Sequence, residues 1–537
     1  MASEEVLRKT LKNADGKPFA KYKGITNNFV LEDFEIFFDD VQNDRSGHTD
    51  VRVRVPMRRA GFPEDTRKNA SRTVALRDLI ARRFWETSRA VARSPFPKMT
   101  GGEVFMPRPG QEIVERFSVV VTEFYVEARF NVNLPCDGGK VNATAAEALI
   151  FDRIASIVSE SMLYSAYKPS KLYNHLETNE NADYIRDKLK EKGLAAFIAE
   201  GSVLPRREDD LAPLVDAESF DVLSEYECSF EVPNGPPVRG FGIPAGVTMI
   251  AGHSRSGRSG LLDAILTGVY NHIPGDGREY VITRAGAAFV SSQPGRAVTA
   301  VDVSSFLPGA RSFQTSSAHS AMSEYAEISE SLEMGSDLLL MDDEYSHPSL
   351  FRRSPVDPGS DPVTVPEVAG SLAAQGVSLI ISTNDASVFR FADRVLLMRD
   401  HRIVGTMSGG SEAPCTYTLP SDRYPVSRNV SYEKARKEVF TGVSAIRTFE
   451  IGEVKLEVPL VPIFDMAQAR CLAEVLAAAR NLMDGTRTLR DVCETAVREV
   501  YKTDFEEGRG MYHASVRPMD VAAVLNRHPS MLMIRKD

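Results

Sequence analysis

The feature that most constrains the fold is an apolar run that passes through a glycine-rich loop into a helical pattern. Residues 247–251 (VTMIA) precede the loop 252–260 (GHSRSGRSG), and the apolar pattern 261–266 (LLDAIL) follows it. The loop matches the phosphate-binding pattern G-x-x-x-x-G-K-[ST], except that Arg258 replaces the lysine. The order strand, glycine loop, helix predicts an α/β domain with a parallel sheet. A glycine-rich turn that only leads into a helix is the alternative interpretation.

The residue types of this loop suit a nucleotide. Glycines let backbone N–H groups surround phosphate oxygens, and the N-terminus of a helix adds its positive end. Ser259 offers a hydroxyl to Mg²⁺, while the guanidinium of Arg258 contacts phosphate with a bulkier, planar fork than the usual ammonium. We therefore expect ATP or ADP to contact Gly252, Ser256, Gly257, Arg258, Ser259 and Gly260.

A second apolar run, residues 336–344 (SDLLLMDDE), ends in three carboxylates. In nucleoside triphosphatases such a strand supplies one acid to the Mg²⁺ shell and the next acid to the attacking water. Asp342 fits the metal role together with Ser259. Asp343 takes the position of the acid that acts on water, one methylene shorter than the usual glutamate, and Glu344 is the next candidate. The alternative is an ordinary strand end at the surface. The glycine loop earlier in the same α/β segment favours the nucleotide interpretation over this alternative.

Length and composition indicate several folded domains. The chain has 537 residues, 43% hydrophobic and 26% charged, which at about 150 residues per domain suggests three or four domains and excludes disorder. The expected fold class is α/β, with a central P-loop nucleotide-binding domain, an α+β N-terminal domain and a small α+β C-terminal domain. The expected boundaries are 1–216, 221–420 and 445–537.

Local patterns fill in this organisation. Strict alternation predicts a half-buried strand at 51–55, residues 118–130 are strand-rich, and the pattern of 76–92 is helical. Residues 405–429, rich in Gly, Pro, Ser and Tyr, are expected to be a connector, and a strand is expected at 449–458. Buried parallel strands are expected at 247–251, 338–341, 377–381 and 395–398. A helix is expected from an N-cap at Asp465 to Gly485.

The charge distribution is uneven. The net charge is −10, yet the stretch from Arg52 to Lys98 holds thirteen Lys and Arg against four Asp and Glu. Such a basic stretch suggests a nucleic-acid surface, with a solvated face as the alternative. The residues expected to contact RNA are Arg52, Arg54, Arg82 and Arg83.

No membrane segment or metal pattern is evident. No run approaches the roughly 18 apolar residues of a membrane span, and the first residues lack the pattern of a leader, so a cytoplasmic location is the default expectation. Five cysteines lie far apart, and the nine histidines form no H-x-x-x-H group. We expect reduced thiols without a metal.

The segment after the glycine loop carries a family resemblance. Residues 270–283 (YNHIPGDGREYVIT) resemble a signature of the predicted ATPases of the ABC class, a family distinct from transporters. Further stretches that are similar lie at 20–24, 51–61, 108–112, 125–130, 301–306 and 377–393. The resemblance implies a family-specific N-terminal domain, an ABC-type domain and a smaller C-terminal domain. Some eukaryotic relatives are associated with mitochondrial RNA editing, so the resemblance also makes a mitochondrial location conceivable.

Three departures from the family pattern bear on activity. Arg258 replaces lysine, Asp343 replaces glutamate, and residues 319–324 (HSAMSE) lack the glycine of the usual signature segment, which a homo- or heterodimer partner contributes to the site. No histidine occupies the segment 382–385 (STND). We expect an ATP-binding, RNA-associated protein with weak or lost hydrolysis. The alternatives are a non-hydrolysing structural subunit of an RNA-processing complex and, less favoured, a small-molecule kinase.

Overall fold

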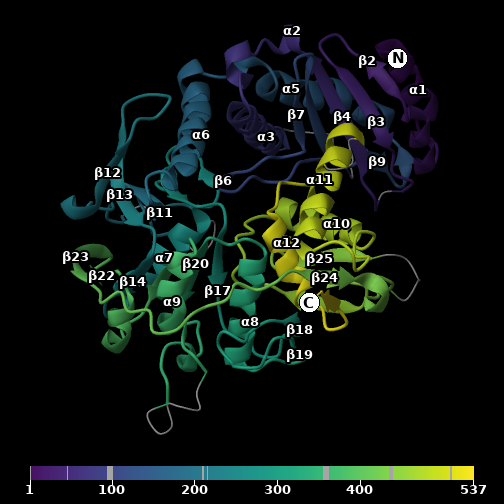
Figure 1. Ribbon diagram of the computed structural model, residues 1–537. Coiled ribbons are helices and arrows are strands. Elements are labelled where there is room, and N and C mark those ends of the chain that lie inside the picture. Colours follow the sequence, from purple (N-terminus) through teal and green to yellow (C-terminus); the bar gives the residue numbers. More distant parts are fainter. Residues whose placement is uncertain are drawn as a thin grey trace. The chain divides into compact units, whose positions relative to one another are not determined.

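The computed structural model forms two compact units (Figure 1). Unit 1 comprises residues 1–179, 465–471 and 501–515, and unit 2 comprises 180–464, 472–500 and 516–537. The structure describes residues 2–44, 46–92, 101–207, 211–214, 216–354, 362–434, 440–507 and 511–536. Arg93 and Lys98, at the end of the basic stretch, lie outside them. None of the helices in the described ranges combines the length and apolar character that a membrane crossing requires.

Unit 1 is built on a seven-stranded sheet in the order β1-β2-β3-β4-β8-β5, with β7 paired to β8. Its strands are β1 (Ala2–Ser3), β2 (Asn28–Val30), β3 (Glu35–Asp40), β4 (Thr49–Pro56), β5 (Val104–Phe105), β7 (Val119–Val121) and β8 (Tyr125–Val132). The predicted alternation is confirmed in β4, where the valines 51, 53 and 55 are buried and Arg52 and Arg54 are not. One face of the sheet is therefore apolar and the other carries arginines.

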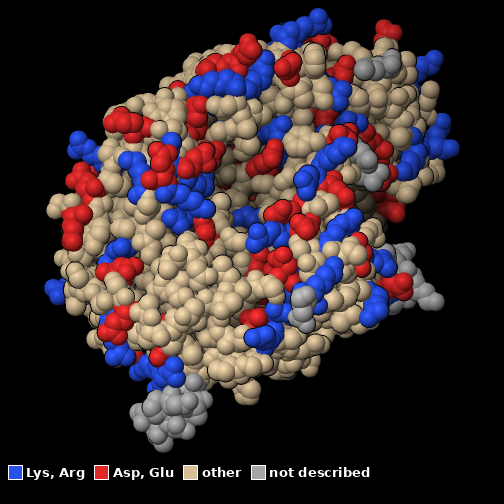
Figure 2. All heavy atoms as spheres, in the orientation of Figure 1, with Lys and Arg blue, Asp and Glu red and all other residues tan. Residues whose placement is uncertain are grey.

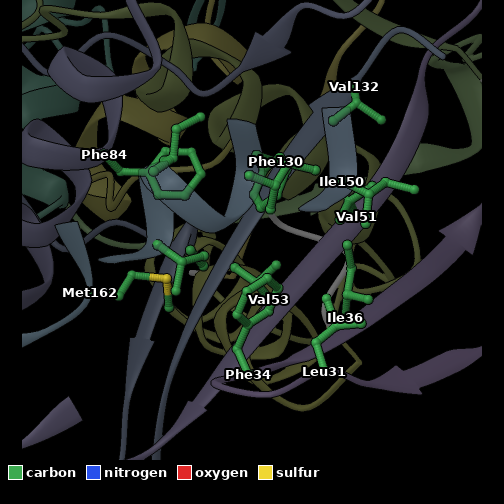
Figure 3. Close-up of a cluster of buried hydrophobic side chains, with 14 of the residues drawn as sticks. Leu31, Phe34, Ile36, Val51, Val53, Phe84, Phe130, Val132, Ile150 and Met162 are labelled. Carbon is green, nitrogen blue, oxygen red and sulfur yellow. The ribbon is translucent and has the colours of Figure 1, made fainter. Parts of the chain in front are cut away.

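The helix α3 (Ala70–Ala92) contributes Leu76, Ile80 and Phe84 to the same core as the valines of β4, which confirms the predicted helix. Figure 3 shows Phe84 in this core together with Val51, Val53 and Phe130. The Phe84 ring packs on that of Phe130, with 5.0 Å between centroids. The other short elements of unit 1 are α1 (Glu4–Ala14), η1 (Phe19–Ile25), α2 (Met57–Ala60), η2 (Glu64–Arg67), β6 (Glu112–Ile113), β9 (Cys136–Asp137), β10 (Lys140–Val141), α4 (Ala143–Glu147), η3 (Ala148–Ile154), α5 (Ala155–Ser161) and η4 (Tyr164–Ala166). The helices α6 (Pro169–Leu189), α10 (Met466–Ala479) and α11 (Leu489–Glu507) contribute residues to both units.

Unit 2 is built on a six-stranded sheet in the order β17-β20-β21-β14-β22-β23. Its strands are β14 (Val247–Ala251), β17 (Ala287–Val290), β20 (Leu338–Asp342), β21 (Ser378–Ser382), β22 (Arg394–Arg399) and β23 (Arg402–Ser408). Strand β23 pairs antiparallel with β22, whereas the pairs β14-β21, β14-β22, β17-β20 and β20-β21 are parallel. The four buried parallel strands expected from the sequence are thus confirmed.

Helices cover both faces of this sheet. The helix α7 (Arg258–Thr267) packs on the face that carries Ile250 and Ile380, together with the antiparallel sheet β12-β13-β11-β16. The helices α8 (Ser320–Glu333) and α9 (Val365–Ala374) pack on the opposite face. The remaining elements of unit 2 are β11 (Leu194–Ala199), η5 (Ser224–Tyr226), β12 (Glu227–Phe230), β13 (Val238–Pro244), β15 (Asn271–His272), β16 (Val281–Thr283), β18 (Val298–Val301), β19 (Phe313–Thr315), η6 (Pro348–Leu350), η7 (Ala386–Phe391), β24 (Arg423–Val426), η8 (Ser427–Asn429), β25 (Thr441–Ala445), β26 (Thr448–Ile451), β27 (Val454–Glu457), α12 (Pro518–Leu525) and β28 (Leu532–Arg535).

Three local predictions differ from the structure. The expected connector 405–429 contains the end of β23 and the strand β24. The expected strand 449–458 is a hairpin of β26 and β27, because Gly452 takes a φ of 57° and reverses the chain. The helix that begins after Asp465 ends at Ala479, before Gly485, although Asp465 caps it as expected through Ala467 N and Gln468 N, both at 3.0 Å.

The compact units also divide the chain elsewhere than the expected domain boundaries. The change from unit 1 to unit 2 falls between residues 179 and 180, whereas 216 was expected. The reason is that β11 pairs with both β13 and β16, which joins residues 194–199 to the sheet of unit 2. The expected C-terminal domain 445–537 is divided between the two units because segments 465–471 and 501–515 belong to unit 1.

The helix α8 carries four buried glutamates spaced three residues apart. Three of them pair with arginines: Glu327 with Arg527 at 2.6 Å, Glu330 with Arg296 at 2.9 Å and Glu333 with Arg423 at 2.6 Å. Glu324 differs, because it accepts a hydrogen bond from the backbone N of His347 at 2.7 Å. Burial raises the pKa of Glu324 to about 8. Glu324 therefore favours its protonated form in the folded chain.

The variant Glu324→Gln should remove a pH dependence of stability. Between the usual pKa of 4.5 and the raised value of about 8, the folded chain holds a proton that the unfolded chain has released. This side chain therefore lowers the free energy of unfolding as pH rises, by up to about 1.4 kcal/mol per pH unit. Urea unfolding at about pH 5 and about pH 8 should show the loss in wild type and not in the variant.

The control for this measurement is Glu453→Gln, at a glutamate that is exposed in the turn between β26 and β27. It should keep the pH dependence of the wild type. The interpretation fails if Glu324→Gln and Glu453→Gln follow the same pH dependence.

Candidate nucleotide-binding site

The sheet of unit 2 brings the two sequence motifs to one edge. Ser382, at the end of β21, pairs in register with Ile250 of β14 on one side and with Asp342 of β20 on the other. The glycine loop leaves β14 directly after this register position, and the acids leave β20 at it. Since the carboxyl ends of parallel strands form the usual ligand edge of an open α/β sheet, the predicted site residues converge where a ligand would bind.

The glycine loop has the conformation of an anion site. Arg255 and Gly257 take φ angles of 65° and 98°, in the left-handed region. Gly257 is the N-cap of α7 and has no side chain that could accept a hydrogen bond from the helix. The first backbone N–H groups of α7 can therefore donate to a bound anion. Among the described residues, the buried hydroxyl of Ser256 also has no hydrogen-bond partner. These donors fit the phosphates of a nucleotide.

Ser259 and Asp342 form the predicted Mg²⁺ pair. The Ser259 hydroxyl donates to Asp342 Oδ2 at 2.9 Å, and Asp342 is buried. A hydroxyl and a carboxylate are the hard oxygen donors that Mg²⁺ prefers, and Mg²⁺ usually completes its shell with phosphate oxygens and water. The residues present therefore fit the ion.

Arg258 points into the acids that follow β20. Its guanidinium donates to Ser382 Oγ at 3.1 Å and lies 3.5 Å from Asp343 Oδ1 and 3.4 Å from Glu344 Oε1. The Arg258 side chain is only 6% exposed, whereas that of Glu344 is 53% exposed. The residue at the lysine position of the loop thus neutralises the acids expected to act on water.

Two residues that the motifs did not single out complete this edge. Asn384 links the halves of the site, because its Oδ1 accepts from Gly252 N at 3.0 Å and its backbone N donates to Asp343 Oδ2 at 3.2 Å. His401, in the turn between β22 and β23, donates its backbone N to the carbonyl of Ser256 at 2.9 Å. Asn384 stands in the segment 382–385, where the sequence showed only the missing histidine. No sequence signal marks His401.

A cavity of about 510 Å³ opens beside the glycine loop. Gly257 and Gly260 line it on the loop side, and Phe220, Leu214 and Met398 give it an apolar wall. A largely apolar pocket next to an anion site is suited to a ligand with a charged end and a flat, apolar end.

The motif that carried the family resemblance is largely structural here. His272 Nδ1 lies 2.8 Å from the buried Asp276 Oδ2, which also pairs with Arg206 at 2.6 Å. Arg278 reaches α7, where it pairs with Asp263 at 3.0 Å. Arg278 thus ties this segment to the helix that follows the glycine loop, while Asp276 holds His272 and Arg206 within it.

All four arginines expected to contact RNA lie within 4 Å of a carboxylate in unit 1, and the Arg83–Glu86 pair is the longest, at 3.8 Å. Arg52 lies 2.6 Å from Asp39, and Arg54 lies 2.7 Å from Glu127, a side chain that is 1% exposed. Arg82 lies 2.5 Å from the buried Asp78. The Arg83 side chain is 41% exposed and donates to the Glu160 carbonyl at 3.1 Å. Figure 2 shows Lys and Arg mixed with Asp and Glu over the visible face.

Two family models match the chain. A model described as the P-loop domain of ABC ATPases matches residues 168–413, and one described as the N-terminal domain of ATPases of the ABC class matches residues 4–165. An uncharacterised protein of Methanocaldococcus jannaschii is 37% identical over 112 residues, which are 19% of this chain and 25% of that protein. The chain thus spans about a quarter of the length of this relative.

Solved structures of ATP-binding cassettes also match. A dimeric cassette in a post-hydrolysis state, bound to ADP and Pi, has a TM-score of 0.22 at 12% identity and covers 34% of this chain and 96% of its own. A cassette of an ABC transporter complex from Clostridium perfringens has a TM-score of 0.24 at 15% identity and covers 40% of this chain and 89% of its own.

Two neighbouring arginines of α3 offer a matched test of the basic stretch. Arg82→Gln removes one cation from Asp78, which is fully buried and keeps Arg116 and His175 at 3.2 Å each. It should lower the free energy of unfolding by roughly 1–3 kcal/mol. Arg83→Gln, at a largely solvated side chain, should change it by less than about 0.5 kcal/mol. Equal effects of the two variants in urea unfolding would contradict the structural role assigned to Arg82.

Proposed function

Because the chain belongs to the ATPases of the ABC class, we propose that it binds ATP with Mg²⁺ and hydrolyses it slowly. The observation that carries the proposal is the position of Arg258. Its guanidinium lies against Asp343 and Glu344, the two acids expected to act on water. The loop thus keeps its phosphate donors while the water-activating acids are occupied.

Binding rests on residues of the loop and the strand ends. The backbone N–H groups at the start of α7 and the buried Ser256 hydroxyl hold the phosphates, and the apolar cavity beside Gly257 receives the base. Ser259 and Asp342 hold Mg²⁺, which neutralises charge on the terminal phosphates when bound. Arg258 adds a second positive group near the phosphates, because the loop places it at the lysine position.

Hydrolysis needs a carboxylate that can orient and deprotonate water. Asp343 is engaged twice, by Arg258 at 3.5 Å and by the backbone N of Asn384 at 3.2 Å, and its side chain is one methylene shorter than glutamate. Glu344 is more exposed but lies one residue further along the chain. Both features work against placing water in line with the terminal phosphate, so slow turnover follows.

A second subunit is part of the proposal. In this class a partner's signature segment completes the site, and here that segment would be 319–324 at the N-terminus of α8. His319 caps α8 without a side-chain hydrogen bond, so this helix end has N–H groups to offer to a phosphate. A homodimer that forms on ATP binding fits these features, while a scaffold without turnover is the alternative. RNA binding stays a prediction, since Arg52, Arg54 and Arg82 are engaged by carboxylates.

Gly260→Asp tests where the phosphates bind. A Cβ at Gly260 meets nothing within 4 Å, whereas one at Gly257 would lie 2.7 Å from His401 Nδ1. An aspartate in the first turn of α7 also suits the helix dipole, so the fold should hold. Its charge should repel the phosphates and weaken ATP·Mg²⁺ binding at least about tenfold in isothermal titration. Gly260→Asn, of nearly the same shape without the charge, is the control, and equal affinities of the two variants would mean that the phosphates lie elsewhere.

The double variant Arg258→Lys, Asp343→Glu tests the cause of slow hydrolysis. Wild type should turn over below the roughly 1–10³ s⁻¹ of typical enzymes. Freeing the acid and lengthening it should raise phosphate release at least about tenfold. Arg402→Lys, at an exposed arginine of β23, is the control and should match wild type. Turnover of wild type within the typical range would refute the proposal, and an unchanged rate in the double variant would assign the defect to the signature segment or to a missing partner.

A further inference from the structure

Three potential metal ligands meet in unit 1, apart from the nucleotide site. They are Cys471 on α10, Asp504 on α11 and His513 in the segment after α11. Their ligand atoms all lie within 4.8 Å of one another. Cys471 is fully buried, the Asp504 side chain is 3% exposed and that of His513 is 15% exposed. These side chains therefore meet in the interior with one solvent-facing edge at His513.

Backbone contacts hold this cluster in place. Arg129 of β8 donates to the carbonyls of Asp504 and Phe505, the latter at 3.0 Å. The N of Phe117 donates to the carbonyl of His513 at 3.1 Å. Two of the three ligands are thus positioned from their own backbone by the sheet of unit 1, independently of what their side chains bind. A site whose ligands are fixed in this way needs little ordering when an ion enters.

The donor set selects the kind of ion. A thiolate, an imidazole and a carboxylate together suit Zn²⁺, whereas Mg²⁺ and Ca²⁺ take oxygen donors. The charges also balance, because a thiolate and a carboxylate carry two negative charges against the two positive charges of the ion. Without an ion, the His513 Nδ1 and Asp504 Oδ2 atoms lie 2.8 Å apart.

The distances are compatible with one ion. Two ligand atoms about 2.1 Å from a tetrahedral Zn²⁺ lie roughly 3.4 Å apart, and a sulfur at about 2.3 Å lies slightly further from each. The observed span of up to 4.8 Å closes to this geometry when the side chains move by roughly 1 Å. Such a shift is within the reach of side-chain torsions while the backbone stays fixed.

We propose that Cys471, Asp504 and His513 bind one Zn²⁺ ion, with water in the fourth position. Binding releases the proton of the Cys471 thiol and uses His513 in its neutral form. The ion links the segments 465–471 and 501–515, which lie far apart in sequence yet belong to unit 1. Its role is structural, to hold these C-terminal segments together within that unit.

Cobalt titration of the untagged full-length chain tests the proposal without ATP. After removal of metals by a chelator, Co²⁺ should bind with one equivalent and give the near-ultraviolet absorption of a cobalt–thiolate bond, and Zn²⁺ should displace it. Cys471→Ser should abolish this absorption. Cys228→Ser, at a half-buried cysteine of unit 2, is the matched control and should keep it. His513→Gln should lower the Co²⁺ affinity by more than about 100-fold, because the loss of a ligand exceeds the 10–100-fold effect of outer residues.

Several outcomes would overturn the proposal. Absence of the cobalt–thiolate absorption in wild type, or its persistence in Cys471→Ser, excludes Cys471 as a ligand. If Cys471→Ser does not fold, as judged by circular dichroism, His513→Gln decides, since its side chain lies at the more exposed edge of the cluster. Wild-type affinity in His513→Gln would then refute the site.

Discussion

The register of the three strands β20, β21 and β14 is the constraint on which the candidate site depends. Ser382 stands opposite both Ile250 and Asp342, so the glycine loop and the acids leave the sheet side by side. A shift of one residue in the β20–β21 pairing would turn Asp342 to the other face and break its 2.9 Å hydrogen bond with Ser259. The strands are completely buried, so helices and the second sheet of unit 2 cover their side chains on both faces.

Charge compensation in the interior is the second theme of the molecule. The buried Arg258 faces the more exposed acids Asp343 and Glu344, whereas Glu327, Glu330 and Glu333 of α8 pair with arginines that are themselves buried. A buried pair adds little net stability, but loss of one partner leaves a charge without compensation. The α8 pairs specify how α8 meets Arg423 of β24 and Arg527, which follows α12. The Arg258 contacts are the ones on which the proposal of slow hydrolysis rests.

Much of the fold followed from local patterns. The alternation at 51–55, the helix at 76–92 and the four parallel strands are confirmed because period and burial are properties of short segments. Turn chemistry was harder to read: Gly452 divides an expected strand into a hairpin through a single positive φ. The domain boundaries depended on sheet pairing between β11 and β16, which no local pattern reveals.

The candidate site likewise contains residues that local motifs predicted and residues that only the folded structure reveals. Gly252 to Gly260, Asp342 and Asp343 were found from motifs, and the structure brings them to one edge. The contacts of Asn384, His401 and Arg258 come from strands distant in sequence, so motifs gave no sign of them. The pairing of the basic stretch shows the same division: Glu127 reaches Arg54 from the neighbouring strand β8, whereas Asp78 engages Arg82 from one turn earlier in the same helix. Composition counts charges but does not pair them.

Hydrogen exchange of the full-length chain with and without ATP·Mg²⁺ tests the central claim most directly. If phosphates occupy the N-terminus of α7 beside the end of β20, the amides of residues 252–261 should become protected, together with those of residues 342–344. The rest of the central sheet, already buried, should change little. Unchanged exchange in both segments under saturating ATP, or protection confined to other parts of the chain, would contradict the account.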